Sequence, residues 1–320
     1  MATYYMSEPT VRAANNFNVA EDADALLKAM KGLGTDEQVI IDILTKRSND
    51  QRRKLTEFYM QEYGKDLLKE LKSELGGNFE DVIIGLMSTP LDYMCSELNK
   101  ALKKGTDNQA LIDILCTRNN KQVKEIVDRY EALYDRPLVE HICSEAKGDF
   151  RKFMTLIVTC VRNSPGKVTP DSANEQAQAL YKAGEAKLGT SEEVFNKILA
   201  HESYEQLRLV MDEYKKVSGR TLEQAIKDEI SGPLHDAYMA VLECVMSQAI
   251  YFAKTLHKAM AGLGTNDATL KRIIVSRSEI DLGNIKKEYE KLYGKTLESV
   301  VKSETSGDYK RSLVALIGGA

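Results

Sequence analysis

The chain has 320 residues, of which 43% are hydrophobic and 29% charged, with a formal net charge of −4 and a pI near 5.8. This composition is typical of a globular protein with a sizeable core. The negative charge argues against nucleic-acid binding through bulk positive charge and against a polybasic membrane anchor. At about 150 residues per domain, the length by itself suggests two domains.

Targeting and catalytic signals are weak throughout the sequence. Residues 1–18 lack an apolar core of signal-peptide length, and no apolar run is long enough to span a bilayer. Five scattered cysteines without C-x-x-C spacing favour small buried side chains in a reducing cytosol over disulfides or a zinc site. Four histidines show no metal-binding spacing, and no nucleophile–base pair stands out. We therefore expect a cytoplasmic protein that is not an enzyme.

Helix-period patterns dominate from the N-terminal part onward, because Val and Ile recur at spacings of three and four rather than in alternation. In the first 90 residues these patterns cover about 21–31, 36–46, 51–63, 65–74 and 79–88. Thr35 is predicted to be the N-cap of the second helix, since Thr35-x-x-Gln38 matches a capping box. The pattern predicts a unit of five short helices and no strands.

The same unit recurs four times along the chain. A Gly-Thr pair precedes an apolar helical segment in each copy, and a Leu stands 32 residues after each Thr. The four glycines are Gly34, Gly105, Gly189 and Gly264. Two Pro and one Gly among polar residues indicate a linker at 162–171. The predicted organisation is a tail at 1–18 and repeats at 19–89, 90–161, 172–248 and 249–320.

Each repeat also pairs its Gly turn with one glutamate forty residues later. These glutamates are Glu74, Glu145, Glu229 and Glu304. Helix ends followed by Gly leave carbonyl oxygens without intrahelical partners, and one carboxylate added to them makes a hard-oxygen site that suits calcium. Magnesium demands tighter octahedral geometry, and zinc would need His or Cys. The alternative is ordinary helix C-caps with solvated glutamates, but four copies at one offset favour calcium.

The motifs resemble those of the annexin family over essentially the whole chain after about residue 18. The resemblance rests on Lys31-Gly32-Leu33-Gly34-Thr35-Asp36 with its distant Glu, on Ile274–Leu282 and on Thr305–Tyr309. It is closest to the invertebrate type with a short N-terminal tail. It implies an all-α fold of four annexin repeats, five helices each, arranged as a slightly curved disc with calcium loops on its convex face.

The resemblance also implies a set of calcium ligands and membrane contacts. The main ligands would be Met30, Gly32, Gly34 and Glu74 in repeat one, Gly184, Lys187, Gly189 and Glu229 in repeat three, and Met260, Gly262, Gly264 and Glu304 in repeat four. Minor sites in repeat one would use Thr35 with Glu37, and Lys72 and Leu75 with Glu80. Leu33, Leu188 and Leu263 would touch the bilayer, although for Leu188 a loop position half-covered by its neighbours is as good an interpretation.

Repeat two departs from the family pattern. Its loop, Leu102-Lys103-Lys104-Gly105-Thr106, is one residue shorter than that of repeat one and lacks the first Gly. Fewer carbonyls can then converge, although Glu145 remains. We therefore predict that the site at Gly105 and Glu145 is weak or silent.

The expected function is calcium-dependent binding to anionic phospholipid membranes such as phosphatidylserine, with Ca²⁺ as the cofactor and a role in membrane organisation or trafficking. We expect a monomer in solution, with oligomers left open on membranes, and neither a nucleic-acid partner nor a protein partner recruited by the tail. The rival hypotheses are a calcium-independent helical-repeat scaffold and an ion channel. A channel would be lined by Glu97, Asp113, Arg118 and Arg272, for which a structural salt-bridge network is the favoured alternative.

Overall fold

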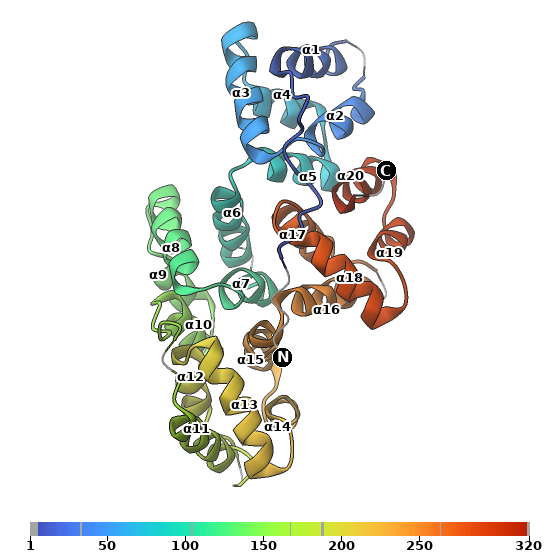
Figure 1. The fold of residues 1–320 in the computed structure, drawn as a ribbon. Coiled ribbons are helices and arrows are strands. Elements are labelled where there is room, and N and C mark those ends of the chain that lie inside the picture. The colour runs from blue at the N-terminus through green and yellow to red at the C-terminus, as the bar shows by residue number, and fades with distance from the viewer. Residues whose placement is uncertain are drawn as a thin grey trace. The chain divides into compact units, whose positions relative to one another are not determined.

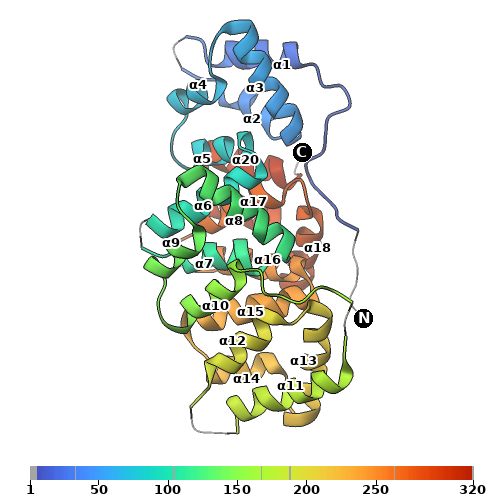
Figure 2. The same ribbon diagram turned by 90° about the vertical axis from the view of Figure 1, so that its left-hand side faces the viewer.

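The computed structural model describes residues 6–32, 34–103, 105–166, 168–186, 189–262 and 264–318, and it divides into two compact units (Figures 1 and 2). The central unit runs from Met94 to Tyr251, and the terminal unit comprises the described residues up to Tyr93 together with those from Phe252 onward. The predicted all-α fold is confirmed, since these described ranges hold helices and no strand beyond an isolated bridge between Gly262 and Gly264. Within the same ranges no helix is both long and apolar enough to cross a membrane.

The terminal unit contains both ends of the described chain. Its helices are α1 (Val19–Ala29), α2 (Glu37–Leu44), α3 (Asn49–Tyr63), α4 (Leu67–Glu74), α5 (Gly77–Met87), α17 (Asp267–Arg277), α18 (Leu282–Tyr293), α19 (Leu297–Glu304) and α20 (Gly307–Ile317), and α16 (Gln248–Met260) enters it. The first five lie within about two residues of the predicted ranges. Helices α5, α17 and α20 pack against one another, and α2 packs on α20 (Figure 1).

The central unit likewise consists of short helices. Its helices are α7 (Asn108–Leu111) with a π-helical continuation (Ile112–Cys116), α8 (Asn120–Tyr134), α9 (Leu138–Glu145), α10 (Gly148–Val158), α11 (Pro170–Ala183), α12 (Glu192–His201), α13 (Tyr204–Ser218), α14 (Leu222–Glu229) and α15 (Gly232–Met246), and α6 (Pro90–Lys103) enters it. Tyr238 lies in the core of this unit, where the centroid of its ring is 5.0 Å from that of the Phe153 ring in an edge-to-face contact. Its hydroxyl donates to Asn196 Oδ1 at 2.8 Å, so the buried phenol has a partner.

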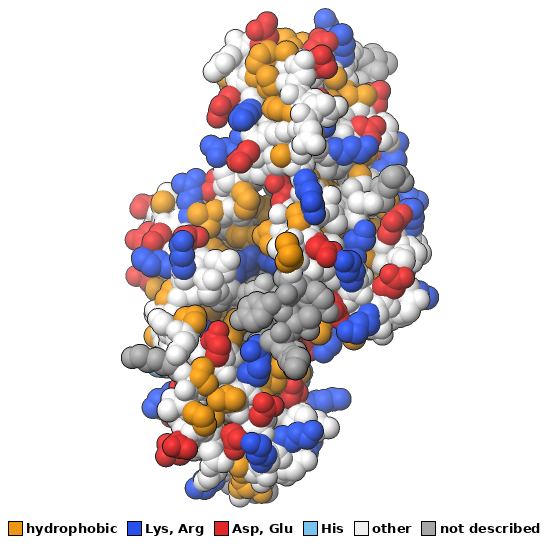
Figure 3. Space-filling view, viewed as in Figure 1, with side chains coloured by type: hydrophobic (Ala, Val, Ile, Leu, Met, Phe, Trp, Pro, Cys, Tyr) orange, Lys and Arg blue, Asp and Glu red, His pale blue; other side chains and the backbone are white. Residues whose placement is uncertain are grey.

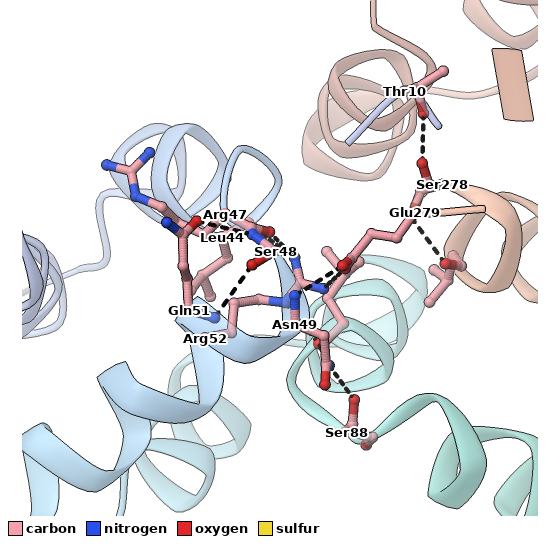
Figure 4. Close-up of polar contacts among 12 residues, drawn as sticks. Thr10, Leu44, Arg47, Ser48, Asn49, Gln51, Arg52, Ser88, Ser278 and Glu279 are labelled. Atoms are coloured by element: carbon pink, nitrogen blue, oxygen red, sulfur yellow. Dashed lines mark hydrogen bonds and ion pairs between the residues drawn. The ribbon is translucent and has the colours of Figure 1, made fainter. Parts of the chain in front are cut away.

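A buried arginine connects distant segments of the terminal unit (Figure 4). The Arg52 side chain is 2% exposed and donates to the carbonyl oxygens of Leu86, at 2.8 Å, and of Leu44, at 3.0 Å. It also forms an ion pair with Glu279, whose other carboxylate oxygen accepts from the Asn49 backbone N–H at 3.0 Å. Repeats one and four are therefore joined by a hydrogen-bonded charge pair.

Residues 6–11 of the N-terminal tail lie along repeat four, whereas Ala14 contacts Gln51 of repeat one, whose side chain accepts from its N–H at 2.9 Å. Thr10 N and Val11 N both donate to Ser278 O, at 2.8 and 3.0 Å, and Gly283 N donates to Glu8 O at 2.8 Å. A Cβ atom at position 283 would stand 2.6 Å from that Glu8 oxygen. The close passage of the tail thus requires a glycine at this position.

Three of the four residues predicted for a channel, Glu97, Asp113 and Arg118, make polar contacts in the central unit, and the fourth, Arg272, is 2% exposed on α17 of the terminal unit. Asp113 is 3% exposed and accepts from Tyr251 Oη at 2.6 Å and from Gln109 Nε2 at 2.8 Å. Arg118 donates to the Asp113 carbonyl at 3.1 Å, and Glu97 pairs with Lys100 at 2.9 Å. Hydrogen bonds and ion pairs of this kind are what the alternative to a channel, a structural salt-bridge network, predicts.

The cysteines follow the expectation in part. All five are free thiols. Cys95, Cys116 and Cys244 are buried and Cys160 is half-buried, but the expectation of burial is wrong for Cys143, which is exposed. Helix α9 turns this residue outward, since its buried residues are Leu138, His141 and Ile142.

Candidate calcium-binding loops

The loop between the first and second helix of each repeat is closed by one backbone hydrogen bond. A carbonyl of an alanine near the end of the first helix accepts from a backbone N–H two residues after the loop glycine. The pairs are Asp36 N to Ala29 O at 2.9 Å, Asp107 N to Ala101 O at 3.0 Å, Ser191 N to Ala183 O at 2.8 Å and Asn266 N to Ala259 O at 2.8 Å. The loop glycines have φ between +82° and +91°. L side chains rarely adopt this conformation, which explains the recurrent Gly.

The predicted N-cap at Thr35 is wrong, because the second helix is capped one residue later. Asp36 accepts from Val39 N at 3.2 Å, and the helix begins at Glu37. The same one-residue shift occurs at Asp107, Ser191 and Asn266 in the other repeats. Asp and Asn cap helices at least as well as Thr does. The threonine hydroxyl is thereby free for another role.

That hydroxyl contacts the distant glutamate. Thr35 Oγ1 donates to Glu74 Oε2 at 2.7 Å, and Thr190 Oγ1 donates to Glu229 Oε2 at 2.9 Å. In repeat four Thr265 Oγ1 lies 3.4 Å both from Glu304 Oε2 and from the Glu304 carbonyl oxygen. Each glutamate is the last residue of its helix, α4, α14 or α19. The structure therefore brings the Gly turn and the glutamate together in these three repeats.

Repeat two has a different arrangement. Thr106 Oγ1 donates to the backbone carbonyl of Glu145 at 3.0 Å rather than to its carboxylate. The Glu145 carboxylate instead accepts from Ser144 Oγ at 3.2 Å. Its side chain is thus held differently from those of the other three glutamates.

The remaining main-site residues supply backbone oxygens. Met30 is the C-cap of α1, and Gly32 and Gly34 follow it with φ of +119° and +91°. Met260 is the last residue of α16, and Gly262 pairs with Gly264 across the turn. Gly184, the C-cap of α11, is buried, and a Cβ atom there would meet the Phe195 ring at 3.4 Å. The predicted positions Leu33, Lys187, Leu188 and Leu263 lie outside the described residues.

The predicted minor-site residues lie at helix ends of repeat one. Glu37 is the first residue of α2, and Glu80 lies in the first turn of α5. Lys72 is exposed on α4, and Leu75 follows that helix with a buried side chain, so that only its carbonyl oxygen is suited to a metal.

The donor set fits a hard cation that binds oxygen. Across the described ranges no three His, Cys, Asp or Glu side chains gather to hold a metal by themselves. Each loop therefore offers one carboxylate and backbone carbonyls of a left-handed Gly turn. Calcium accepts six to eight oxygens in flexible geometry, including water and external ligands. A single carboxylate makes such a site weak and leaves coordination positions open.

Sequence reasoning missed a buried tyrosine that stands 24 residues after the loop threonine in every repeat. These residues are Tyr59, Tyr130, Tyr214 and Tyr289. Burial raises the pKa of Tyr289 to about 12, so its hydroxyl stays protonated at neutral pH. The hydroxyl partners differ: they are Glu70, His141, Glu185 and His257 in chain order. The constant offset was a signal that could have identified the tyrosines, but not their partners.

Comparisons with known proteins agree with the repeat pattern. The annexin family model matches residues 21–86, 93–157, 175–241 and 251–316. Annexin B10 of Drosophila melanogaster is 56% identical over 99% of both chains, and Annexin A4 of Mus musculus is 44% identical over 97% of this chain and 98% of its own. The structure of annexin III matches with a TM-score of 0.93, 42% identity and coverage of 98% and 97%. Calcium-bound annexin (Sm)1 matches with a TM-score of 0.83, 32% identity and coverage of 98% and 94%.

Proposed function

Because the chain belongs to the annexin family, which is known for calcium-dependent phospholipid binding, we propose that it binds anionic phospholipid membranes through calcium held in its Gly-turn loops. The observation that carries this proposal is the hydrogen bond from the loop threonine to the distant glutamate, at 2.7 Å for Thr35 and Glu74. It holds a carboxylate beside the Gly turn, whose backbone carbonyls are the other ligands of the proposed site. Calcium, when bound there, supplies the positive charge and open coordination positions that a lipid phosphate needs.

The chain's own residues shape the loops and orient the ligands. The alanine carbonyl that closes each loop fixes its two ends, and the left-handed glycine turns the chain sharply. The threonine hydroxyl orients the carboxylate, which a flexible glutamate at a helix end would otherwise leave in many rotamers. We assign the main sites to the loops of repeats one, three and four, with Glu74, Glu229 and Glu304.

We assign the minor calcium sites to repeat one, and we propose that the site of repeat two binds calcium weakly. Glu37 and Glu80 lie at helix N-termini, where carboxylates are favourable. In repeat two the shorter loop and the diverted Glu145 carboxylate both count against strong binding. The outcome would be a peripheral protein that associates with membranes when calcium rises and serves their organisation or trafficking.

Liposome co-sedimentation tests this proposal. The protein should sediment with phosphatidylserine vesicles in calcium and remain in the supernatant with chelator. Glu74→Gln and Glu304→Gln each remove the carboxylate charge and should raise the calcium concentration at half-binding about threefold to tenfold, on the order of 1 kcal/mol. Glu145→Gln is the matched control and should change it little. Sedimentation that ignores calcium would refute the proposal, and an equal effect of Glu145→Gln would refute the assignment of repeat two.

A further inference from the structure

A basic residue follows each of the four buried tyrosines after six positions. The pairs are Tyr59 with Lys65, Tyr130 with Arg136, Tyr214 with Arg220 and Tyr289 with Lys295. The sequence thus supplies a phenol hydroxyl and a cation at the same spacing in every repeat. Both groups donate hydrogen bonds, so the place between them suits an oxyanion.

In repeats one and three the chain itself supplies that oxyanion. The Glu70 carboxylate accepts from Tyr59 Oη and from Lys65 Nζ, the latter at 2.6 Å. The Glu185 carboxylate accepts from Tyr214 Oη at 2.7 Å and from Arg220 Nη1 at 2.6 Å. The two carboxylates come from different elements, α4 and the loop after α11, yet each bridges the tyrosine and the cation.

Repeat four keeps the donors and lacks both carboxylates. The position of Glu70 is taken by Val300, and the position of Glu185 is taken by Ala261. A hollow of about 650 Å³ lies at this place, between α16, α18 and α19. Lys295 is exposed at this hollow, and no described carboxylate pairs with it. The Tyr289 hydroxyl lies 3.4 Å from His257 Nδ1, a long contact.

We propose that this hollow in repeat four binds a phosphate group of an external ligand. Lys295 and the Tyr289 hydroxyl would take the places that their counterparts hold around Glu70 and Glu185. Ser299 and Ser303 also line the hollow, but their hydroxyls already donate to the backbone carbonyls of Thr296 and Val300, each at 2.8 Å, so the proposal rests on Lys295 and Tyr289. A phosphate has three strong acceptor oxygens, so it can accept from the lysine and from the phenol at the same time. The volume leaves room for the group that carries the phosphate.

Glu304 borders the same hollow and is a candidate calcium ligand. Its charge opposes an anion unless a cation is bound there. If the ligand is a lipid headgroup, the inference rests on the proposed function, because that headgroup would reach the hollow beside the loop of repeat four. If the ligand is a soluble phosphate ester, the hollow acts independently of membranes. In both cases the group that the hollow would bind is a phosphomonoester.

The first experiment uses inositol 1,4,5-trisphosphate as a soluble probe and the full chain in calcium, with binding measured by isothermal titration calorimetry. Lys295→Met removes the cation, and Val300→Glu introduces the internal carboxylate of repeat one. Each should weaken binding about tenfold or more, since a charge-assisted hydrogen bond is lost or an internal competitor is gained. Lys65→Met is the matched control and should leave binding unchanged, because Glu70 already occupies that place.

The second experiment separates the two sources with vesicles of equal charge that contain phosphatidylinositol 4-phosphate or phosphatidylserine. A preference for the phosphoinositide that Val300→Glu abolishes supports a lipid headgroup, and binding of the soluble probe alone supports a free phosphate ester. The inference is overturned if wild-type protein binds neither probe, or if Lys65→Met weakens binding as much as Lys295→Met. If the wild-type protein fails to bind phosphatidylserine vesicles in calcium, the proposed function is refuted. The calorimetric titration with the soluble probe then tests by itself whether the hollow binds phosphate.

Discussion

At the residue scale, Arg52 shows which partners stabilise a buried charge in the terminal unit. Burial lowers the pKa of Arg52 and the Glu279 carboxylate raises it, so the ion pair offsets part of the cost of desolvation. Its other donors are satisfied by backbone carbonyls that close the end of α2 and the end of α5. Since Glu279 belongs to repeat four, the pair links segments far apart in sequence.

We expect Glu279→Gln to destabilise the protein by about 2 kcal/mol, because an amide cannot neutralise the guanidinium left in the interior. Urea unfolding followed by circular dichroism measures the change. Glu298→Gln is the control: it breaks the i,i+4 ion pair with Lys302, whose side chain is 51% exposed, and should cost less than about 0.5 kcal/mol. Equal losses in the two variants would contradict the role given to the buried pair.

At the scale of elements, periodicity predicted the helices of repeat one to within about two residues. Cap position was not predicted correctly, because Thr35 and Asp36 are both good caps in sequence and only the closure of the loop onto Ala29 O selects Asp36. The pairing of each Gly turn with its glutamate was predicted from a constant offset. The partners of the buried tyrosines could not be predicted, since they come from a different element in different repeats.

Loop length is the element-scale variable that distinguishes repeat two. Inserting one Gly between Lys103 and Lys104 gives its loop the length and Gly-x-Gly pattern of repeat one. We expect this insertion to add one calcium site in a calorimetric titration, because a second glycine lets more carbonyls converge near Glu145. Adding Glu145→Gln to the inserted chain should remove that site again. An unchanged stoichiometry would show that loop length does not limit repeat two.

At the scale of the whole molecule, charge and the number of sites decide how binding responds to calcium. Acidic and basic side chains are interspersed on the face shown in Figure 3, and the net charge is −4. Without calcium the protein and an anionic membrane therefore repel each other weakly, within a screening length of about 8 Å at physiological salt. Several weak sites in one chain raise the membrane affinity by avidity once each is filled.

This multiplicity predicts a steep calcium dependence that falls stepwise as sites are removed. In vesicle binding measured against calcium concentration, Glu74→Gln should lower the Hill slope, and the double variant with Glu304→Gln should lower it further and shift the midpoint by more than either single change. When one site already holds the membrane, it keeps lipid headgroups at a high effective concentration near the other sites of the same chain. Each site removed takes away this advantage from the sites that remain. A double variant that keeps the wild-type slope would show that the sites of repeats one and four do not act together, and that a single loop carries the binding.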